Sequence, residues 1–396
     1  MNKDIKFKEL IESSFKGITP KYVEKSSIIV LNQKCIRNNV INYSLAQYHS
    51  DDKAVPENKF LKVGDILINS TGQGTAGRCA FVKELPENKL VTIDSHILVI
   101  RMSDFYTAGF AGYHLYNIEK LLQTFMDGST GQGEFDKQRL YNVFARLPSE
   151  NSRKSIYELL SEIDEKIALN NQINATLEQM AKTLYDYWFV QFDFPDDNGK
   201  PYKSSGGEMV YNETLKRDIP KGWEVKEIQD FCRIFTGKKD VNQASEMGQY
   251  KFFSCAPNFK YSNEKLFEGK AILVSGNGSY TGRTIFVNDA FDLYQRTYAV
   301  VSKTDLDVLE YIFYSMLRSF VPKVSGGTHG SAIPYIVFND IAKETILFHE
   351  NVVDRFMHII INIQKQVIDL SEQNYKLTEM RDWLLPMLMN GQVTVQ

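Results

Sequence analysis

The sequence predicts an α+β protein with two globular, strand-rich domains and two long coiled-coil helices, arranged as an internal duplication. Three observations predict this fold. A segment of the first half recurs in the second half, two long stretches carry apolar residues at helical spacing, and short alternating apolar runs dominate the rest. A chain of 396 residues has room for two or three domains of ordinary size.

The duplication is visible in two pairs of segments. Residues 63–82, VGDILINSTGQGTAGRCAFV, match residues 268–287, EGKAILVSGNGSYTGRTIFV, at an offset of 205. The identities are Gly64 with Gly269, Ser70 with Ser275, Gly77-Arg78 with Gly282-Arg283 and Phe81-Val82 with Phe286-Val287. A second pair follows at an offset of 200, in which Glu150-Asn151 and Asn174 match Glu350-Asn351 and Asn374. Two repeats in the same order indicate that the chain is a duplication.

Each strand-rich block is followed by a stretch that predicts one long helix, about 152–190 and 352–390. Apolar residues keep 3-4 spacing over about five heptads in the first stretch, and Asn170 and Asn174 fall near its seam, where polar residues can fix register. Pro386 should kink or stop the second helix, and Gly391 suits a C-terminal cap. Helices of roughly 57 Å exceed what a small domain needs. One alternative is that each helix is a core helix of its own bundle. The length and the duplication of the two helices instead favour an intramolecular coiled coil that acts as a spacer.

The sequence pattern of the two blocks predicts α+β domains. Short apolar runs such as IIVL at 28–31, DILIN at 65–69, HILVI at 96–100 and AILVS at 271–275 predict strands, and shorter helices are expected at about 111–126 and 306–319. A polar connector rich in Gly, Pro and Ser precedes Trp223, which marks the entry to the second block. The expected domains are 1–150 and 220–350, with helices in 151–192 and 351–396 and the linker at 193–219.

Four polar loops are the candidate functional segments, and they cover 70–78, 128–135, 275–283 and 325–332. Gly lets a loop approach a DNA groove closely, amide and hydroxyl groups pair with base edges, and Arg suits guanine or phosphate. Turn chemistry explains any one loop as well, but four loops in duplicate positions favour DNA contact. The candidate DNA-binding residues are Ser70, Thr71, Gln73, Arg78, Thr130, Gln132, Asn277, Tyr280, Arg283, Thr328 and His329, with Lys34, Arg37 and Arg296 as secondary candidates for phosphate.

No pattern typical of an enzyme or a metal site is present in the sequence. Residues 72–77 spell GxGxxG, but the following RCAFV reads as a strand, whereas a dinucleotide site needs a helix there. The sequence has no P-loop and no Asn/Asp-Pro-Pro-aromatic motif of amino-methyltransferases, and its 4 cysteines are scattered. We therefore expect no catalytic residue, metal ligand or cofactor in this chain. The lack of an apolar leader or span predicts a cytoplasmic protein.

The charge is the main argument against DNA binding, because the net charge is −3 and the pI is near 6.1. The helical stretches 152–190 and 351–391 carry −2 and −1, so the remaining chain is neutral. A duplicated protein-interaction scaffold that does not bind DNA is the rival interpretation, and the acidic pI favours it slightly. An enzyme with an unrecognised site is the third.

The chain resembles one known family over nearly its whole length, and two segments are the most specific part of that resemblance. Residues 188–225, WFVQFDFPDDNGKPYKSSGGEMVYNETLKRDIPKGWEV, resemble the central conserved region of type I restriction-modification specificity (S) subunits. Residues 381–393, RDWLLPMLMNGQV, resemble their C-terminal conserved region. The resemblance implies two target recognition domains separated by two antiparallel conserved helices, related by an internal pseudo-twofold duplication.

The resemblance also implies the function and the partners. Such a chain is non-catalytic, reads double-stranded DNA at a bipartite asymmetric site, and binds two modification (methyltransferase) subunits that flip the target adenine. Restriction (endonuclease and translocase) subunits join them. S-adenosylmethionine, ATP and Mg are then expected on the partner subunits and not on this chain. The recognition domains vary within the family, so base-contacting residues cannot be transferred by position.

Overall fold

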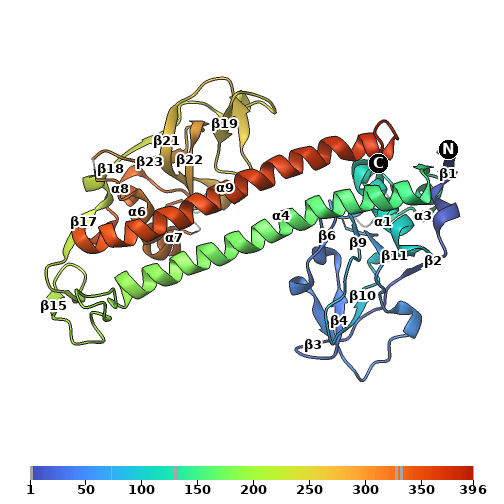
Figure 1. Ribbon diagram of the computed structural model, residues 1–396, viewed down its shortest axis with the longest axis horizontal. Coiled ribbons are helices and arrows are strands. Elements are labelled where there is room, and N and C mark those ends of the chain that lie inside the picture. The colour runs from blue at the N-terminus through green and yellow to red at the C-terminus, as the bar shows by residue number, and fades with distance from the viewer. Residues whose placement is uncertain are drawn as a thin grey trace. The chain divides into compact units, whose positions relative to one another are not determined.

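The computed structural model describes residues 3–72, 74–127, 133–304, 306–325, 329–330 and 333–395. The chain folds as two compact units. Unit 1 comprises Met1–Ala168 with Tyr375–Gln396, and unit 2 comprises Leu169–Asn374. Each unit therefore contains one strand-rich domain together with a stretch of both long helices (Figure 1).

The domain of unit 1, domain 1, is built on two four-stranded sheets with strand orders β10-β4-β7-β3 and β2-β11-β8-β9. Alternation along the central strands creates two cores: Ile66 and Ile68 of β8 pack toward helix α1, whereas Leu67 packs toward β4. The main strands are β2 Ser13–Lys16, β3 Tyr22–Val23, β4 Ile28–Leu31, β7 Gln47–His49, β8 Ile66–Asn69, β9 Cys79–Phe81, β10 Leu90–Ile93 and β11 Ile97–Arg101. The shorter pairs are β1 Lys3–Lys6 with β14 Phe144–Leu147, β5 Ile36–Arg37 with β6 Val40–Ile41, and β12 Met126–Asp127 with β13 Glu134–Phe135. The helices are α1 Phe105–Asn117, α2 Glu119–Leu122 and α3 Lys137–Tyr141.

The domain of unit 2, domain 2, has one six-stranded sheet of order β18-β23-β21-β22-β19-β20. The strands of this sheet are β18 Cys232–Thr236, β19 Tyr250–Phe253, β20 Lys260–Ser262, β21 Phe267–Ser275, β22 Thr284–Leu293 and β23 Thr297–Ser302. A separate pair is formed by β17 Glu224–Glu227 and β24 Thr345–Phe348. Its helical segments are α5 Ile228–Phe231, α6 Leu309–Ser315, the π-turn η8 Met316–Phe320, α7 Val321–Val324 and α8 Phe338–Ala342. The strand runs named from the sequence are confirmed. The helix expected at about 111–126 begins earlier, at Phe105, and is broken at Ile118. The helix expected at about 306–319 is confirmed as a continuous helical segment from Leu309 to Val324, which contains the π-turn η8.

Strand pairing confirms the duplication and corrects the sequence alignment by one residue. Asn69 pairs with Ile97 and Ser275 pairs with Thr297, so Asn69, and not Ser70, is the counterpart of Ser275. The same shift moves Gly64 away from Gly269. Gly77-Arg78 and Gly282-Arg283 keep their equivalence, because the β9 and β22 pairings agree at offset 205. The loop of domain 1 is therefore one residue longer, and the Ser70–Ser275 identity is coincidental.

The two long helices are α4 Glu150–Tyr185, followed by the π-turn η5 Asp186–Val190, and α9 Glu350–Met389. Helix α9 continues for one turn past Pro386 before Gly391, at φ 67°, closes it. The Gln392 N–H donates to the Met387 carbonyl at 2.9 Å and the Gly391 N–H to the Leu388 carbonyl at 3.2 Å, which is a Schellman cap. The expected glycine cap is confirmed.

Within each unit the two helices pack antiparallel. In unit 2 the Asn170 side chain contacts Asn374, and the ring of Tyr185 lies 6.1 Å from that of Phe356. In unit 1 Asp164 contacts Arg381, and Ile156 shares a core with Leu388. The prediction that the two amphipathic stretches pack on each other is therefore confirmed in both units.

Asparagines lie in the seam of unit 2, as the heptad pattern predicts. Asn170 is fully buried, and its Nδ2 donates to Asn374 Oδ1 at 2.9 Å. Asn374 Nδ2 donates to Asn171 Oδ1 at 2.8 Å, and Asn174 Nδ2 donates to Ser371 Oγ at 3.1 Å. A shift of one helix along the other would break these bonds, so they specify register.

We expect Asn374→Leu to lower the free energy of unfolding of unit 2 by about 1–3 kcal/mol, because it leaves the buried Asn170 amide without its acceptor. Replacing both Asn170 and Asn374 with Leu should restore most of that loss, since two apolar groups need no hydrogen bond. Denaturant unfolding of the full chain measures both values. Gln373→Ala, at an exposed position of the same helix with no hydrogen bond to the other helix within the described residues, is the control and should change the free energy by less than about 0.5 kcal/mol. Equal losses in the control and in Asn374→Leu would contradict the assigned role.

The connector of residues 193–219 is folded against domain 2. The Asp193 carboxylate accepts hydrogen bonds from the Ser204 N–H at 2.7 Å and from its hydroxyl at 2.6 Å. These bonds lower the pKa of Asp193. The connector ends in the hairpin of β15 Met209–Asn212 and β16 Arg217–Pro220, and Trp223 is buried immediately before β17, as predicted for the entry to the second block.

Candidate nucleic-acid interface

Three segments of domain 2 meet where β21 ends, and the main chain holds them together. The Gly276 N–H donates to the Arg296 carbonyl at 2.9 Å, and the Ile336 N–H donates to the Gly276 carbonyl at 2.9 Å. The Gly278 N–H donates to the Pro334 carbonyl at 3.0 Å. We call the surface formed by 276–282, 294–296, 329–330 and 333–336 the loop edge of domain 2. It brings together two of the loops predicted from the sequence.

The candidate residues of domain 2 differ in the exposure of their side chains and in the contacts that these side chains make. Tyr280 is about half exposed, at 48%, and Asn277 is partly exposed, with its Oδ1 accepting from Cys255 Sγ at 3.3 Å. The His329 ring stacks on Tyr335 at 5.3 Å. Its Nε2 lies 3.3 Å from Asp340 Oδ2.

Arg283 does not present a free guanidinium. Its Nη1 donates to the Ala256 carbonyl at 3.3 Å and its Nη2 to the Pro257 carbonyl at 3.2 Å. Partial burial lowers the pKa of Arg283. These bonds make Arg283 a support for the segment after β19, which weakens its prediction as a direct DNA contact. Thr328 lies outside the described residues.

Domain 1 repeats the same main-chain arrangement. The Ser70 N–H donates to the His96 carbonyl at 2.8 Å, and the Phe135 N–H donates to the Ser70 carbonyl at 2.8 Å. Ser70 is therefore the counterpart of Gly276, and its side chain is buried at 1% exposure. Residues 70–72, 74–77, 94–96 and 133–135 form the loop edge of domain 1.

Thr71 and Arg78 are the other described candidates of domain 1. Thr71 Oγ1 lies 2.9 Å from His96 Nδ1 and accepts from Gln33 Nε2 at 2.6 Å. Arg78 is partly exposed, and its positive charge acts on the pKa of Glu119, which burial raises. Gln73, Thr130 and Gln132 lie outside the described residues.

The turn before the last central strand is the part of each edge that sequence reasoning missed. It carries His96 before β11 and Arg296 before β23, at the same offset of 200 that relates the two long helices. The sequence pattern indicates Arg296 only as a secondary candidate for phosphate and His96 only as the start of a predicted strand. The offset of 200 between these two positions was the sequence signal that could have identified them. Lys34 and Arg37 are exposed, and Lys34 follows Gln33, which contacts Thr71.

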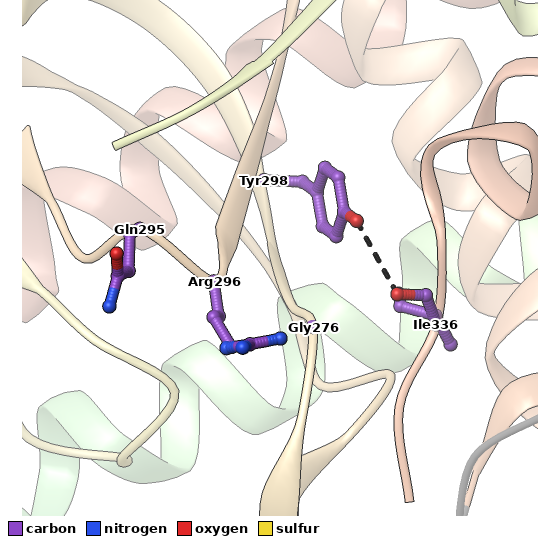
Figure 2. Close-up of a pocket in the computed structure, with 5 residues that line it drawn as sticks. All are labelled: Gly276, Gln295, Arg296, Tyr298 and Ile336. Carbon is purple, nitrogen blue, oxygen red and sulfur yellow. Dashed lines mark hydrogen bonds between the residues drawn. The ribbon is translucent and has the colours of Figure 1, made fainter. Parts of the chain in front are cut away.

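A polar pocket of about 240 Å³ opens at the loop edge of domain 2, lined by Gly276, Gln295, Arg296, Tyr298 and Ile336 (Figure 2). The Tyr298 hydroxyl donates to the Ile336 carbonyl at 3.4 Å, and burial, with a contribution from Asp340, raises the pKa of Tyr298. A Cβ on Gly276 would lie 2.3 Å from the Arg296 carbonyl oxygen and 2.9 Å from the Tyr298 ring. The pocket therefore depends on glycine at 276.

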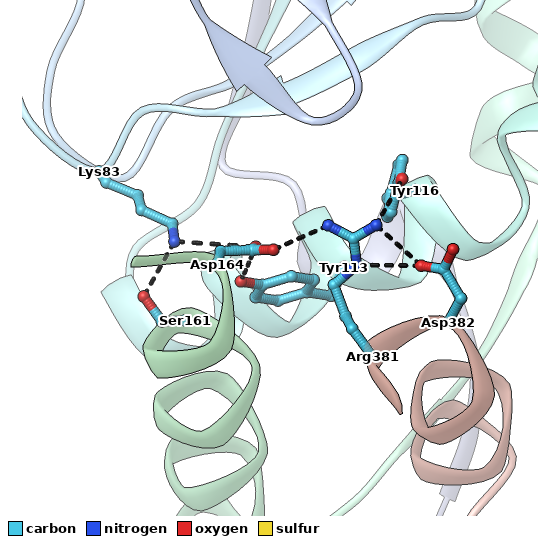
Figure 3. Close-up of polar contacts among 7 residues, drawn as sticks. All are labelled: Lys83, Tyr113, Tyr116, Ser161, Asp164, Arg381 and Asp382. Carbon is cyan, nitrogen blue, oxygen red and sulfur yellow. Dashed lines mark hydrogen bonds and ion pairs between the residues drawn. The ribbon is translucent and has the colours of Figure 1, made fainter. Parts of the chain in front are cut away.

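A second feature of unit 1 is a polar network that joins domain 1 to the helix pair (Figure 3). Arg381 Nη1 donates to Asp164 Oδ1 at 2.9 Å, and the Tyr113 hydroxyl donates to Asp164 Oδ2 at 2.6 Å. Arg381 Nη2 lies 3.3 Å from the Tyr116 hydroxyl. Lys83 Nζ lies 4.0 Å from Asp164, and burial lowers the pKa of Lys83 in spite of that carboxylate. Asp164 and Arg381 are 18% and 12% exposed, so this ion pair is largely withdrawn from water.

The equivalent positions of unit 2 carry no ion pair. At offset 200, Asp164 corresponds to Gln364 and Arg381 corresponds to Ala181. The Tyr314 hydroxyl donates to Gln364 Oε1 at 3.0 Å, as Tyr113 does to Asp164. The duplicated junctions thus share a tyrosine hydrogen bond but differ in charge.

The described part of the chain also limits the chemistry. Among these residues no group of three or more His, Cys, Asp or Glu side chains is placed to hold a metal ion, and none of the helices is long and apolar enough to cross a membrane. The segment that follows the GxGxxG of 72–77 is strand β9, as predicted, and not the helix that a dinucleotide site needs.

Comparisons with known proteins converge on one family. The family model described as "Type I restriction modification DNA specificity domain" matches residues 2–179 and 220–370. The type I restriction enzyme MjaIX specificity subunit of Methanocaldococcus jannaschii is 26% identical over 307 residues, which cover 72% of this chain and 69% of that protein. The HindI specificity subunit of Haemophilus influenzae is 24% identical over 414 residues, covering 85% and 88%. The crystal structure of the type I restriction-modification system S subunit from M. genitalium matches with a TM-score of 0.63 at 12% identity, covering 98% of this chain and 96% of that one. At that identity the structural likeness concerns the fold alone.

Proposed function

The chain belongs to the family of type I restriction modification DNA specificity proteins, and from this premise we propose that each of its two domains reads one half of a split DNA site. As a specificity subunit of a type I restriction-modification system, it selects the sequence on which its partners act. The observation that carries the proposal is the repeated loop edge. The same three hydrogen-bonded segments meet in both domains, with different side chains in each.

Two different edges imply an asymmetric target. The side chains of Thr71 and His96 at one edge offer different hydrogen-bonding groups to base edges from those of Asn277 and Arg296 at the other. Helices α4 and α9 each run from one unit into the other. At about 54–60 Å they are long enough to set a spacing of one DNA turn, 34–36 Å, or more. The target is then two short specified blocks with an unread gap.

The test is a selection of bound duplexes from a random pool, with the modification subunits of the same system present. The expected result is two specified blocks separated by a gap of fixed length. A single continuous block would overturn the split-site proposal. If no duplex were retained in a salt-dependent manner, the result would instead favour the rival, a protein-interaction scaffold that does not bind DNA, since phosphate contacts make DNA binding strongly salt-dependent.

The partners are two modification subunits, and exposed apolar patches on the helices support that number. In unit 2, Met180, Leu184, Tyr187 and Ile359 line a groove of about 770 Å³ over α4 and α9. In unit 1 the counterparts of residues 180, 183 and 184 are Met380, Trp383 and Leu384. Trp383 is 60% exposed and Met380 is 44% exposed. Two patches at duplicated positions suit two copies of one partner, because each copy then meets a similar surface.

We expect Trp383→Glu and Met180→Glu each to remove one modification subunit, and both changes together to remove both. A charge in the centre of an apolar interface should weaken binding by about 30-fold or more, which corresponds to about 2 kcal/mol. Light scattering of the reconstituted complex measures the change from two bound subunits to one. Gln366→Glu, at an exposed position of α9 outside the patches, is the control and should leave two. Retention of two subunits by the Trp383 and Met180 variants would contradict the assignment of these patches.

The chain itself acts without catalysis in this proposal. The modification subunits supply S-adenosylmethionine and transfer its methyl group to an adenine, and the restriction subunits supply the ATP- and Mg-dependent translocation and cleavage. The residues of this chain bind, orient and space the DNA. The modest charge of the domains fits this division, because the modification subunits would supply part of the phosphate-binding surface.

A further inference from the structure

We propose that His96 and Arg296 are the specificity-determining side chains of the two domains, and that Arg296 reads a guanine through the pocket at its loop edge. The inference rests on the proposed function, since it needs each edge to face DNA. It goes beyond that function by naming one position per domain and the base chemistry of one of them.

The two residues occupy one structural position. Each is the last residue of the turn before the strand that pairs with β8 or β21. The carbonyl of each accepts a hydrogen bond from the first residue after β8 or β21. The Ser70 N–H donates to the His96 carbonyl at 2.8 Å, and the Gly276 N–H donates to the Arg296 carbonyl at 2.9 Å. Both carbonyls are fixed, so both side chains leave a rigid main chain. Base recognition requires such rigidity, because a bidentate hydrogen bond tolerates little displacement.

The Arg296 guanidinium is available for a ligand. Within the described residues it has no hydrogen-bond or ion-pair partner, and the residue is exposed. Other arginines of unit 2 are engaged: Arg283 donates to two carbonyls and Arg318 pairs with Asp186 at 2.8 Å. Figure 2 shows the Arg296 side chain beside Gly276 in the pocket, with Gln295 on one side and Tyr298 on the other. An unpaired guanidinium on a rigid turn can donate two parallel hydrogen bonds to guanine O6 and N7.

His96 has different chemistry at the same position. Its Nδ1 lies 2.9 Å from Thr71 Oγ1, which orients the ring. Nε2 has no hydrogen-bond partner within the described residues, and the residue is exposed. A single ring nitrogen can make one hydrogen bond to a base edge, whereas the guanidinium can make two. The difference between these two side chains therefore contributes directly to the asymmetry of the target.

The experiment compares Arg296→Ala, Arg296→Lys and His96→Ala with the unmodified chain, each assembled with its modification subunits. Duplex selection at several salt concentrations reads out the preference at every base pair. Arg296→Ala should lower the preference for guanine at one base pair of one half-site by roughly 5- to 150-fold. Arg296→Lys, which keeps the charge but loses the two parallel donors, should do the same. His96→Ala should relax one base pair of the other half-site only.

Arg233→Ala is the matched control, because Arg233 lies on β18 of the same sheet, opposite Val301 and away from the turn. It should leave all preferences unchanged. A uniform loss of affinity in Arg296→Ala, with rescue by Lys and a salt dependence reduced by about one phosphate contact, would overturn the guanine assignment in favour of a phosphate contact. Unchanged preferences in all three variants would overturn the inference. Failure of the proposed function gives a different result, because the unmodified chain would then show no preference at any base pair.

Discussion

Arg381→Ala is expected to destabilise unit 1 by about 3–5 kcal/mol. The substitution leaves the Asp164 carboxylate, which is 18% exposed, without the guanidinium that lies 2.9 Å from it. The Tyr113 hydroxyl remains as a donor and Lys83 Nζ remains 4.0 Å away, but one neutral hydrogen bond and one distant ammonium group do not replace the close guanidinium contact. Hydrogen exchange of the α1 amides measures the change, since it reports on unit 1 separately from unit 2.

The duplication supplies the control for this prediction. Asp164→Gln combined with Arg381→Ala reproduces the residues found at the equivalent positions of unit 2, Gln364 and Ala181. The introduced amide can accept from Tyr113 as Gln364 accepts from Tyr314. The double variant should therefore lie within about 1 kcal/mol of the unmodified chain, because removing both charges of a buried pair is often nearly neutral. A double variant as unstable as Arg381→Ala alone would show that the arginine acts through packing and not through charge.

Removal of one heptad from each long helix is expected to shorten the gap in the DNA target by about three base pairs. The facing segments are 171–177 of α4 and 367–373 of α9, because Asn170 pairs with Asn374 beside them. Seven residues span about 10.5 Å of helix, and one DNA turn of 34–36 Å holds about ten base pairs. Neither half-site sequence should change, since no residue of either loop edge is removed. The same duplex selection measures the gap and both half-sites together.

Insertion of one heptad at the same two places is the complementary variant, and it should lengthen the gap by about three base pairs. Deletion from α4 alone is the negative control, because it breaks the antiparallel register and should destabilise the helix pair. An unchanged gap in both matched variants would mean that the helices do not set the spacing. A change in either half-site sequence would mean that the deletion disturbed the domains.

Local patterns were sufficient to predict much of the fold. Helical periodicity identified α4 and α9, alternation identified the central strands, and Gly391 was correctly expected to cap α9. These signals depend on residues close in the sequence, so they can be read without a structure. The same method placed Ser70 opposite Ser275, one residue off, because side-chain identity at a loop end does not fix strand pairing.

The sequence by itself determined the duplication and the two helices that pack on each other, and it identified two of the three segments of each loop edge as candidates. Only the tertiary structure added the turns at His96 and Arg296 and decided which polar side chains of the loop edges remain free. Arg283 and Arg296 are both arginines of polar turns, but Arg283 donates to the carbonyls of Ala256 and Pro257, and Arg296 has no such partner within the described residues. Likewise Ser70 is buried whereas His96 is exposed. The physical reason is that the availability of a hydrogen-bonding group depends on atoms brought near it by folding, often from distant parts of the chain.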